Sequence, residues 1–200
     1  LNKKQVKLPN AICFNNFFYE KKRKLNNIKL INVSSFLEKK NQLFALAIVK
    51  ELVLMNLNVS MVFLGDGPCL KKCKDLAKKL GIIEYVAFKG NVENVKDFYE
   101  ESNIYLHTAK YEPFGLVLLE SMAAGLPVVS LDGKGNRDFI ENNKNGFIFK
   151  TQSVKIFANQ ILELVKNRTL YCEIAKNGQE TARNYDIKNY IKSLLIIYKN

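Results

Sequence analysis

The sequence predicts an α/β protein whose core is a doubly wound parallel sheet of six strands, followed by helices at the C-terminal end. Short apolar segments of strand type alternate with longer helical segments from residue 28 onward. In addition, 48% of the 200 residues are hydrophobic and only four are prolines, a composition that excludes disorder and permits a buried core. Because strand–helix–strand crossovers are right-handed, such a chain places helices on both faces of its sheet.

Each predicted strand is a short apolar run bounded by polar or turn-forming residues. These runs are Ile28–Val33, Val59–Leu64, Tyr85–Phe88, Ile104–His107, Val128–Leu131 and Phe147–Phe149. The helices predicted between them are Asn41–Met55, Cys69–Leu80, Val95–Ser102, Phe114–Ala124 and Arg137–Asn142. Three more helical patterns follow, around residues 152–167, 170–183 and 187–198. The alternation is typical of a Rossmann-like nucleotide-binding domain, in which ligands lie at the carboxyl ends of the strands.

Residues 1–27 lack this alternation and are predicted to form a connector that leads into a domain of residues 28–200. The chain begins with Leu1 rather than Met, so we expect it to be part of a longer protein. We expect no signal peptide. A membrane-spanning segment is not expected either, since the longest uncharged run, Leu52–Gly65, is shorter than the roughly 18–20 apolar residues that cross a bilayer.

The cysteines and the single histidine predict neither a disulfide framework nor a metal site. Four cysteines are too few for a disulfide scaffold, which fits a reduced, cytoplasmic compartment. Cys69 and Cys73 lie one helical turn apart, but His107 is far from them in sequence. A zinc site needs further ligands nearby, so we expect no metal and no cofactor.

The charge of the chain leaves several kinds of partner open. Lysines and arginines number 31 against 19 acidic residues, which gives a net charge of +12. Such an excess fits nucleic acid, an acidic membrane surface or an anionic substrate. Only four of the cations are arginines, and arginine is the residue favoured for reading phosphates and base edges. We therefore expect no nucleic acid, and keep a peripheral site at the inner face of the cell membrane as an expectation.

The stretch from Glu112 to Glu120 is the most informative for function. It follows a predicted strand, and Pro113 is suited to the first position of the helix predicted from Phe114. A helix start at a strand's carboxyl end offers free N–H groups to a phosphate, and Gly115 lets the phosphate approach. Glu112 as a helix cap and Glu120 as a solvated residue are the structural alternatives. The apolar helix favours a cleft instead, with carboxylates that bind hydroxyls on either side of a phosphate, as in a nucleoside diphosphate sugar.

Three segments together resemble one family. Leu8-Pro9-Asn10-Ala11-Ile12 resembles its interdomain connector, Gly65-Asp66-Gly67-Pro68 its turn after a strand, and Glu112–Pro127 its donor loop and helix, with the Glu-x7-Glu signature. The sequence is similar to the C-terminal, donor-binding domain of family 4 retaining glycosyltransferases of the GT-B type, which have two facing Rossmann-like domains. The resemblance implies UDP- or GDP-sugar as the donor, no divalent ion, and an acceptor-binding N-terminal domain that this chain lacks.

The resemblance also implies roles for individual residues. Glu112 would contact sugar hydroxyls, and Glu120 would hold the ribose hydroxyls. The remaining positions form the walls of the donor site: the backbone at Phe114 and Gly115 near the sugar, the amides of Leu116 and Val117 near phosphate or ribose, and the backbone at Asn91 and Val92 near the base.

The first strand's end departs from the family pattern. Lys40 matches a lysine that grips the diphosphate, but Ser35 stands where an arginine is expected, so one bidentate phosphate contact is missing. A solvated lysine is the alternative for Lys40. His107 at a strand end is more often a packed residue than a catalytic base, and we assign it no catalytic role.

The function expected from these residues is the transfer of a sugar, with retention, from a nucleotide diphosphate sugar to an acceptor glycan or lipid in polysaccharide or glycoconjugate biosynthesis. Lys40, Glu112 and the helix start would carry it by stabilising the leaving diphosphate and holding the sugar. Without the acceptor domain, this chain is expected to bind donor and not turn it over. The alternative is a non-catalytic nucleotide-binding module or a basic nucleic-acid-binding module.

Overall fold

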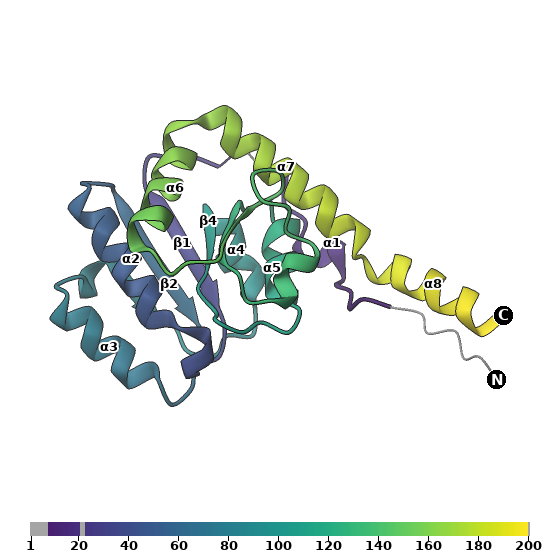
Figure 1. Cartoon of the computed structure of the whole chain (residues 1–200), viewed down its shortest axis with the longest axis horizontal. Helices are drawn as coiled ribbons and strands as arrows, with labels where there is room; N and C mark the ends of the chain where they lie inside the picture. The colour runs from purple at the N-terminus through teal and green to yellow at the C-terminus, as the bar shows by residue number, and fades with distance from the viewer. Residues whose placement is uncertain (1–7, 21–22, 200) are drawn as a thin grey trace.

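The computed structural model describes residues 8–20 and 23–199. Residues 1–7 and 21–22 of the expected connector lie outside the described residues, as does Asn200. The strands form one parallel sheet in the order β3-β2-β1-β4-β5-β6 (Figure 1). Their bounds are β1 (Ile28–Val33), β2 (Val59–Leu64), β3 (Val86–Phe88), β4 (Ile104–His107), β5 (Val128–Leu131) and β6 (Phe147–Phe149). The predicted Rossmann-like fold is thereby confirmed.

The helices follow the predicted pattern with shifted ends. They are α1 (Phe14–Phe17), α2 (Gln42–Leu54), α3 (Leu70–Lys79), α4 (Val95–Glu101), α5 (Leu116–Ala123), α6 (Val154–Lys166), α7 (Arg168–Asn184) and α8 (Ile187–Lys199). Short 3-10 turns occupy Glu38–Lys40, Ile83–Tyr85 and Gly135–Asp138. None of the helices in the described part of the chain is long and apolar enough to cross a membrane.

The sheet separates two apolar cores. Leu30 of β1 belongs to the first core, which lies under α2, α3 and α6. Its neighbour Ile31 belongs to the second core, which lies under α1, α4 and α5. Successive residues of a strand point to opposite faces of the sheet. Because helices cover both faces, both of these side chains are buried. This explains why the strands appear in the sequence as continuous apolar runs.

The start of α5 differs from the sequence prediction. The helix begins at Leu116, not at Phe114, and Pro113 lies outside it. Gly115 is the N-cap residue with φ of 99°, in the left-handed region that glycine adopts without strain. This conformation interrupts the helical path. The amides of Leu118 and Leu119 donate to the Gly115 carbonyl, so those left without an acceptor in the helix are the amides of Leu116 and Val117.

The helix predicted over Arg137–Asn142 is also wrong, since the structure has only the 3-10 turn Gly135–Asp138 there. The cause is the buried Asn136 side chain, which accepts from the Gly133 N–H and donates to Ser130 Oγ and the Leu131 carbonyl. These bonds hold the segment as a loop, because a polar side chain that bonds nearby backbone competes with helix formation.

The segment before β1 packs on the domain. The sequence did not predict α1, whose Phe14 is buried in the second core. Ile12 accepts from the Ile187 N–H and donates to the Tyr185 carbonyl, which fastens this segment to the junction of α7 and α8. Helix α8 extends away from the body of the domain (Figure 1), and none of its described residues is buried.

Candidate functional site

A cavity of about 380 Å³ lies where β1 and β4 end. These neighbouring strands are the point at which the sheet reverses its order, with β1 followed by β2 on one side and β4 by β5 on the other. A crevice forms at this switch point because the loops after the two strands turn in opposite directions. The residues that border it are Asn10, Val33, Ser34, Ser35, Lys40, Glu112, Pro113, Phe114, Gly115, Leu116 and Val117.

Glu112 is held in the wall of this cavity by the loop after β5. Its N–H donates to the Gly133 carbonyl at 2.8 Å, and its own carbonyl accepts from the Gly135 N–H at 2.9 Å. A Cβ atom at Gly135 would stand 2.0 Å from the Pro113 carbonyl oxygen, so only glycine allows this approach. The backbone around Glu112 is therefore fixed from both sides.

Lys40 forms an ion pair with Glu112 across the switch point. The Lys40 Nζ atom lies 2.6 Å from Glu112 Oε2, and the two side chains are only 15% and 9% exposed. The loop that carries Lys40 is tied to the loop after β4, because Thr108 Oγ1 donates to the Lys40 carbonyl and the Lys110 N–H donates to the Lys39 carbonyl. The sequence predicted both residues at this edge but not their contact.

His107, the last residue of β4, lies beneath this pair and is 1% exposed. Its Nε2 atom is 3.4 Å from Glu112 Oε2, without hydrogen-bond geometry. Neither ring nitrogen has a hydrogen-bond partner among the described residues. Burial, reinforced by the Lys40 charge, lowers the pKa of His107 to about 3. The imidazole is therefore neutral at pH 7.

A polar network occupies the end of β1. Ser34 Oγ donates to Asn32 Oδ1, and the Gln42 amide donates to Ser34 Oγ and to the Ser35 carbonyl. Asn32 and Gln42 are buried, whereas Ser35 is exposed on the cavity wall. The sequence predicted Ser35 at this place. It missed Gln42, the first residue of α2, whose position carries no signal of its own.

Glu120 lies on the second turn of α5 and does not border the cavity. Its Oε2 atom accepts a hydrogen bond of 3.1 Å from the hydroxyl of Tyr99, a fully buried residue of α4. Burial raises the pKa of Glu120, and the Tyr99 hydrogen bond opposes that rise. Tyr99 was missed because its contact with Glu120 joins two helices that are separate in the chain.

The two residues predicted near the base lie apart from the cavity. Asn91 is exposed in the loop after β3, and Val92 packs in the second core, in the same apolar cluster as Val117. The structure thus brings Ser35, Lys40, Glu112 and the start of α5 to one cavity. Asn91, Val92 and Glu120 lie outside its lining.

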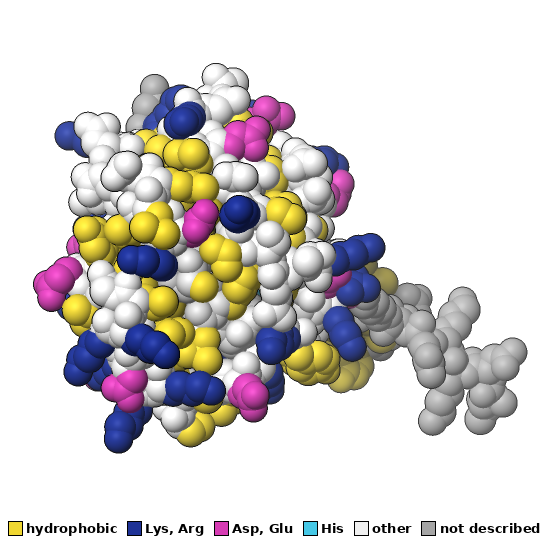
Figure 2. All heavy atoms as spheres, turned by 60° about the vertical axis from the view of Figure 1, so that its left-hand side comes forward, with side chains coloured by type: hydrophobic (Ala, Val, Ile, Leu, Met, Phe, Trp, Pro, Cys, Tyr) yellow, Lys and Arg dark blue, Asp and Glu magenta, His cyan; other side chains and the backbone are white. Residues whose placement is uncertain are grey.

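The described residues offer no cluster that could hold a metal ion, and on one face of the molecule (Figure 2) the cations are mixed with acidic side chains. Among the residues that the structure describes, no group of three or more His, Cys, Asp or Glu could hold a metal ion. On the face in Figure 2, Lys and Arg side chains are scattered among acidic and apolar ones.

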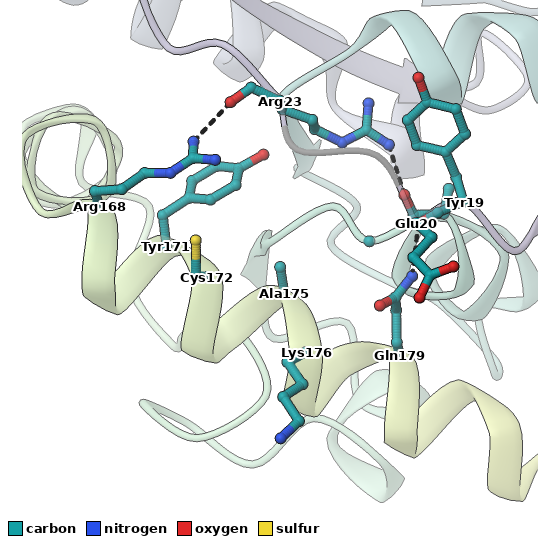
Figure 3. A pocket seen from close by; sticks show the side chains of 11 residues that line it. Tyr19, Glu20, Arg23, Arg168, Tyr171, Cys172, Ala175, Lys176 and Gln179 are labelled. Atoms are coloured by element: carbon teal, nitrogen blue, oxygen red, sulfur yellow. Dashed lines mark hydrogen bonds between the residues drawn. The ribbon is translucent and has the colours of Figure 1, made fainter.

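A second cavity, of about 140 Å³, lies at the opposite edge of the sheet (Figure 3). Arg23 donates there to the carbonyls of Glu100, Ser102 and Ala124, which precede β4 and β5. Arg168 donates to the Arg23 carbonyl. This cavity therefore lies where hydrogen bonds of Arg23 attach the N-terminal segment to the rest of the domain.

Comparisons with known proteins identify the family and the fold of the chain. A family model described as "Glycosyl transferases group 1" matches residues 14–181. The putative glycosyltransferase EpsD of Bacillus subtilis is 27% identical over 141 residues, which are 70% of this chain and 37% of that protein. Anabaena HepE in complex with UDP and glucose matches with a TM-score of 0.85 at 21% identity, covering 96% of this chain and 55% of that chain. Staphylococcus aureus TarM, in a complex that contains UDP, matches with a TM-score of 0.82 at 24% identity, covering 98% of this chain and 38% of that chain.

The strand order and the position of the cavity place the chain in the class of Rossmann-like α/β domains. Within that class, it belongs to the group 1 glycosyltransferase family. Its fold is that of the GT-B glycosyltransferase structures. The chain spans well under half of the length of EpsD.

Proposed function

We propose that this chain is the donor-binding domain of a family 4 retaining glycosyltransferase, which transfers a sugar from a nucleotide diphosphate sugar to an acceptor glycan or lipid. The observation that carries the proposal is that Lys40, Glu112 and the start of α5 meet at one cavity. Lysine and helix amides complement a diphosphate, and a carboxylate complements sugar hydroxyls. UDP is the favoured nucleotide, since the similar HepE and TarM structures contain it.

The proposed mechanism is stabilisation of the leaving diphosphate. Lys40 donates to the phosphate oxygens as the bond to the sugar breaks, and the amides of Leu116 and Val117 point their N–H groups at the same charge. These two amides are the first of α5 and have no acceptor within their own helix. Glu112 orients the sugar, Glu120 binds the ribose, and Asn91 and Val92 lie toward the base.

The proposal extends to the setting of the enzyme. The acceptor domain faces the cavity in the longer protein, so this chain alone binds donor without turnover. The parent enzyme works in the cytoplasm or at the inner face of the cell membrane, in polysaccharide or glycoconjugate synthesis. Since the groups that stabilise charge are a lysine and backbone amides, transferase activity of the parent persists in excess EDTA.

A thermal-shift screen tests the donor assignment. The panel is UDP, GDP, UDP-glucose, UDP-N-acetylglucosamine, GDP-mannose and a short DNA duplex at two salt concentrations. A nucleotide or sugar nucleotide is expected to raise the melting temperature by mass action. Stabilisation by the duplex alone, with steep salt dependence, would support the nucleic-acid alternative and contradict the proposal.

A further inference from the structure

The environment of His107 calls for an explanation that packing does not give. A buried polar group without a hydrogen bond destabilises a fold, whereas an apolar side chain of similar size fills the same space without that cost. His107 is 1% exposed, and neither of its nitrogens has a hydrogen-bond partner among the described residues. Its ring lies against Tyr105 with centroids 6.1 Å apart, a contact that needs no nitrogen atom.

The nitrogen nearest to a polar group is Nε2, 3.4 Å from Glu112 Oε2. The same carboxylate oxygen accepts from Lys40 Nζ at 2.6 Å. Two potential donors therefore face one oxygen, and Lys40 holds it. In the neutral imidazole only one nitrogen carries a hydrogen, and the nearby carboxylate favours that hydrogen on Nε2.

We propose that His107 is a positioning residue that takes over the Glu112 carboxylate when Lys40 moves to the diphosphate of the bound donor. This inference rests on the proposed function, which requires Lys40 at the phosphates and Glu112 at the sugar. The Glu112 side chain is 9% exposed, so without Lys40 its charge would be left poorly solvated. A small rotation that brings Nε2–H within hydrogen-bond distance supplies the missing donor and fixes the carboxylate for the sugar hydroxyls.

The proposal predicts which ligands depend on His107. Glu112 contacts the sugar, whereas the nucleotide is held by Lys40, Glu120 and the start of α5. Loss of the Nε2–H group should therefore weaken the binding of a sugar nucleotide more than the binding of the nucleotide alone. It should not destabilise the free protein, in which the imidazole makes no hydrogen bond.

The experiment compares His107→Leu, which has no donor, with His107→Gln, whose amide can reach the place of Nε2–H. Affinities for UDP, UDP-glucose and UDP-N-acetylglucosamine are measured by calorimetry, and melting temperatures are measured without ligand. For the sugar nucleotide that wild type prefers over UDP, His107→Leu should reduce that preference about tenfold or more, with an unchanged or higher melting temperature. His107→Gln should keep most of the preference.

A preference that survives in His107→Leu would overturn the proposal. So would an equal loss of UDP and sugar-nucleotide binding together with a lower melting temperature, which indicates a packing role, or a His107→Gln variant as impaired as His107→Leu. Failure of the proposed function gives another result: wild type then binds no UDP, or Glu112→Ala fails to change the preference for sugar nucleotide over UDP.

A second readout is the NMR signal of the imidazole, which no other histidine overlaps because the chain has only one. In protein labelled with ¹⁵N-histidine and carrying no affinity tag, the Nε2 resonance should shift when the preferred sugar nucleotide is added. UDP alone should move it less, because UDP leaves the sugar site unfilled. Equal shifts with UDP and with sugar nucleotide would contradict the selective role.

Discussion

Arg23, at the edge of the sheet where the strands begin, donates to three backbone carbonyls and accepts from Arg168 through its own carbonyl. At the edge where the strands end, His107 has no hydrogen-bond partner among the described residues, and Lys40 and Glu112 depend on one contact with each other. Satisfied polar groups fasten a structure, whereas buried charges with few partners are poised to exchange them. By this difference, the cavity at Arg23 is structural, and the cavity at Lys40 and Glu112 is the candidate binding site.

The largest expected effect is the loss of stability when Arg23, at the edge where the strands begin, is replaced. Arg23→Ala should lower the free energy of unfolding by at least about 3 kcal/mol, since each hydrogen bond to a charged group contributes about 1.5–3 kcal/mol. For a domain of this size, that is a fall in Tm of roughly 6–12 °C by calorimetry. UDP affinity at a temperature where the variant is folded should stay unchanged.

Arg137→Ala is the matched control for Arg23. The Arg137 side chain is 56% exposed, and its partner Asp132, which is 9% exposed, keeps a hydrogen bond from the Lys134 N–H when Arg137 is removed, so Arg137→Ala should cost clearly less than Arg23→Ala. Equal destabilisation by the two variants would mean that the Arg23 hydrogen bonds contribute little, and the contrast between the two edges would lose its basis.

Next in size is the effect of Lys40→Ala on nucleotide binding. Removal of a cation that bonds the diphosphate should weaken UDP affinity by about 10–150-fold in calorimetry. Lys39→Ala, which removes the neighbouring exposed lysine, is the control and should have little effect. If both variants bind UDP like wild type, the diphosphate does not lie at this strand end.

The pH dependence of UDP affinity tests whether the Glu120 carboxylate binds the ribose. Ribose binding needs the carboxylate form, so UDP affinity should fall as the pH drops through the pKa of Glu120, which burial raises. Tyr99→Phe removes the hydrogen bond that holds this pKa down, and the fall should then begin at a higher pH. Glu120→Ala should weaken UDP about tenfold and abolish this pH dependence.

Tyr105→Phe is the control for the pH series. It also removes a buried hydroxyl, but that hydroxyl bonds the backbone of Val33 and not Glu120. The acid limb of its UDP affinity should match wild type. An identical shift in both tyrosine variants would show that the hydrogen bond to Glu120 is not the cause.

The smallest expected effect is a gain. Ser35 is exposed on the cavity wall, so Ser35→Arg places a guanidinium there without displacing a buried group. It should tighten UDP binding about two- to fivefold, as partly exposed ion pairs do, and high salt should remove the gain. Calorimetry at two salt concentrations tests this, and an unchanged affinity at low salt would contradict the placement of the diphosphate beside Ser35.

The sequence predicted the strands because their apolar runs fit a sheet buried on both faces, and it placed Lys40 and Glu112 at one edge. It misplaced the start of α5 because Pro113 is typical of a first helical position, whereas the left-handed Gly115 delays the helix. The roles of Arg23 and Tyr99 were not predicted. Their contacts join segments far apart in the chain, and local periodicity carries no information about such contacts.

The most direct test of the account is to map UDP onto the chain by amide chemical shifts in ¹⁵N-labelled protein. The account predicts that the largest shifts occur at the start of α5, at Leu116 and Val117, and in the loops that carry Ser35 and Lys40. Amides around Ala124 and Arg168, at the opposite edge, should stay in place. Shifts concentrated at the Arg23 cavity, with none at the start of α5, would contradict the central claim that nucleotide binds where β1 and β4 end.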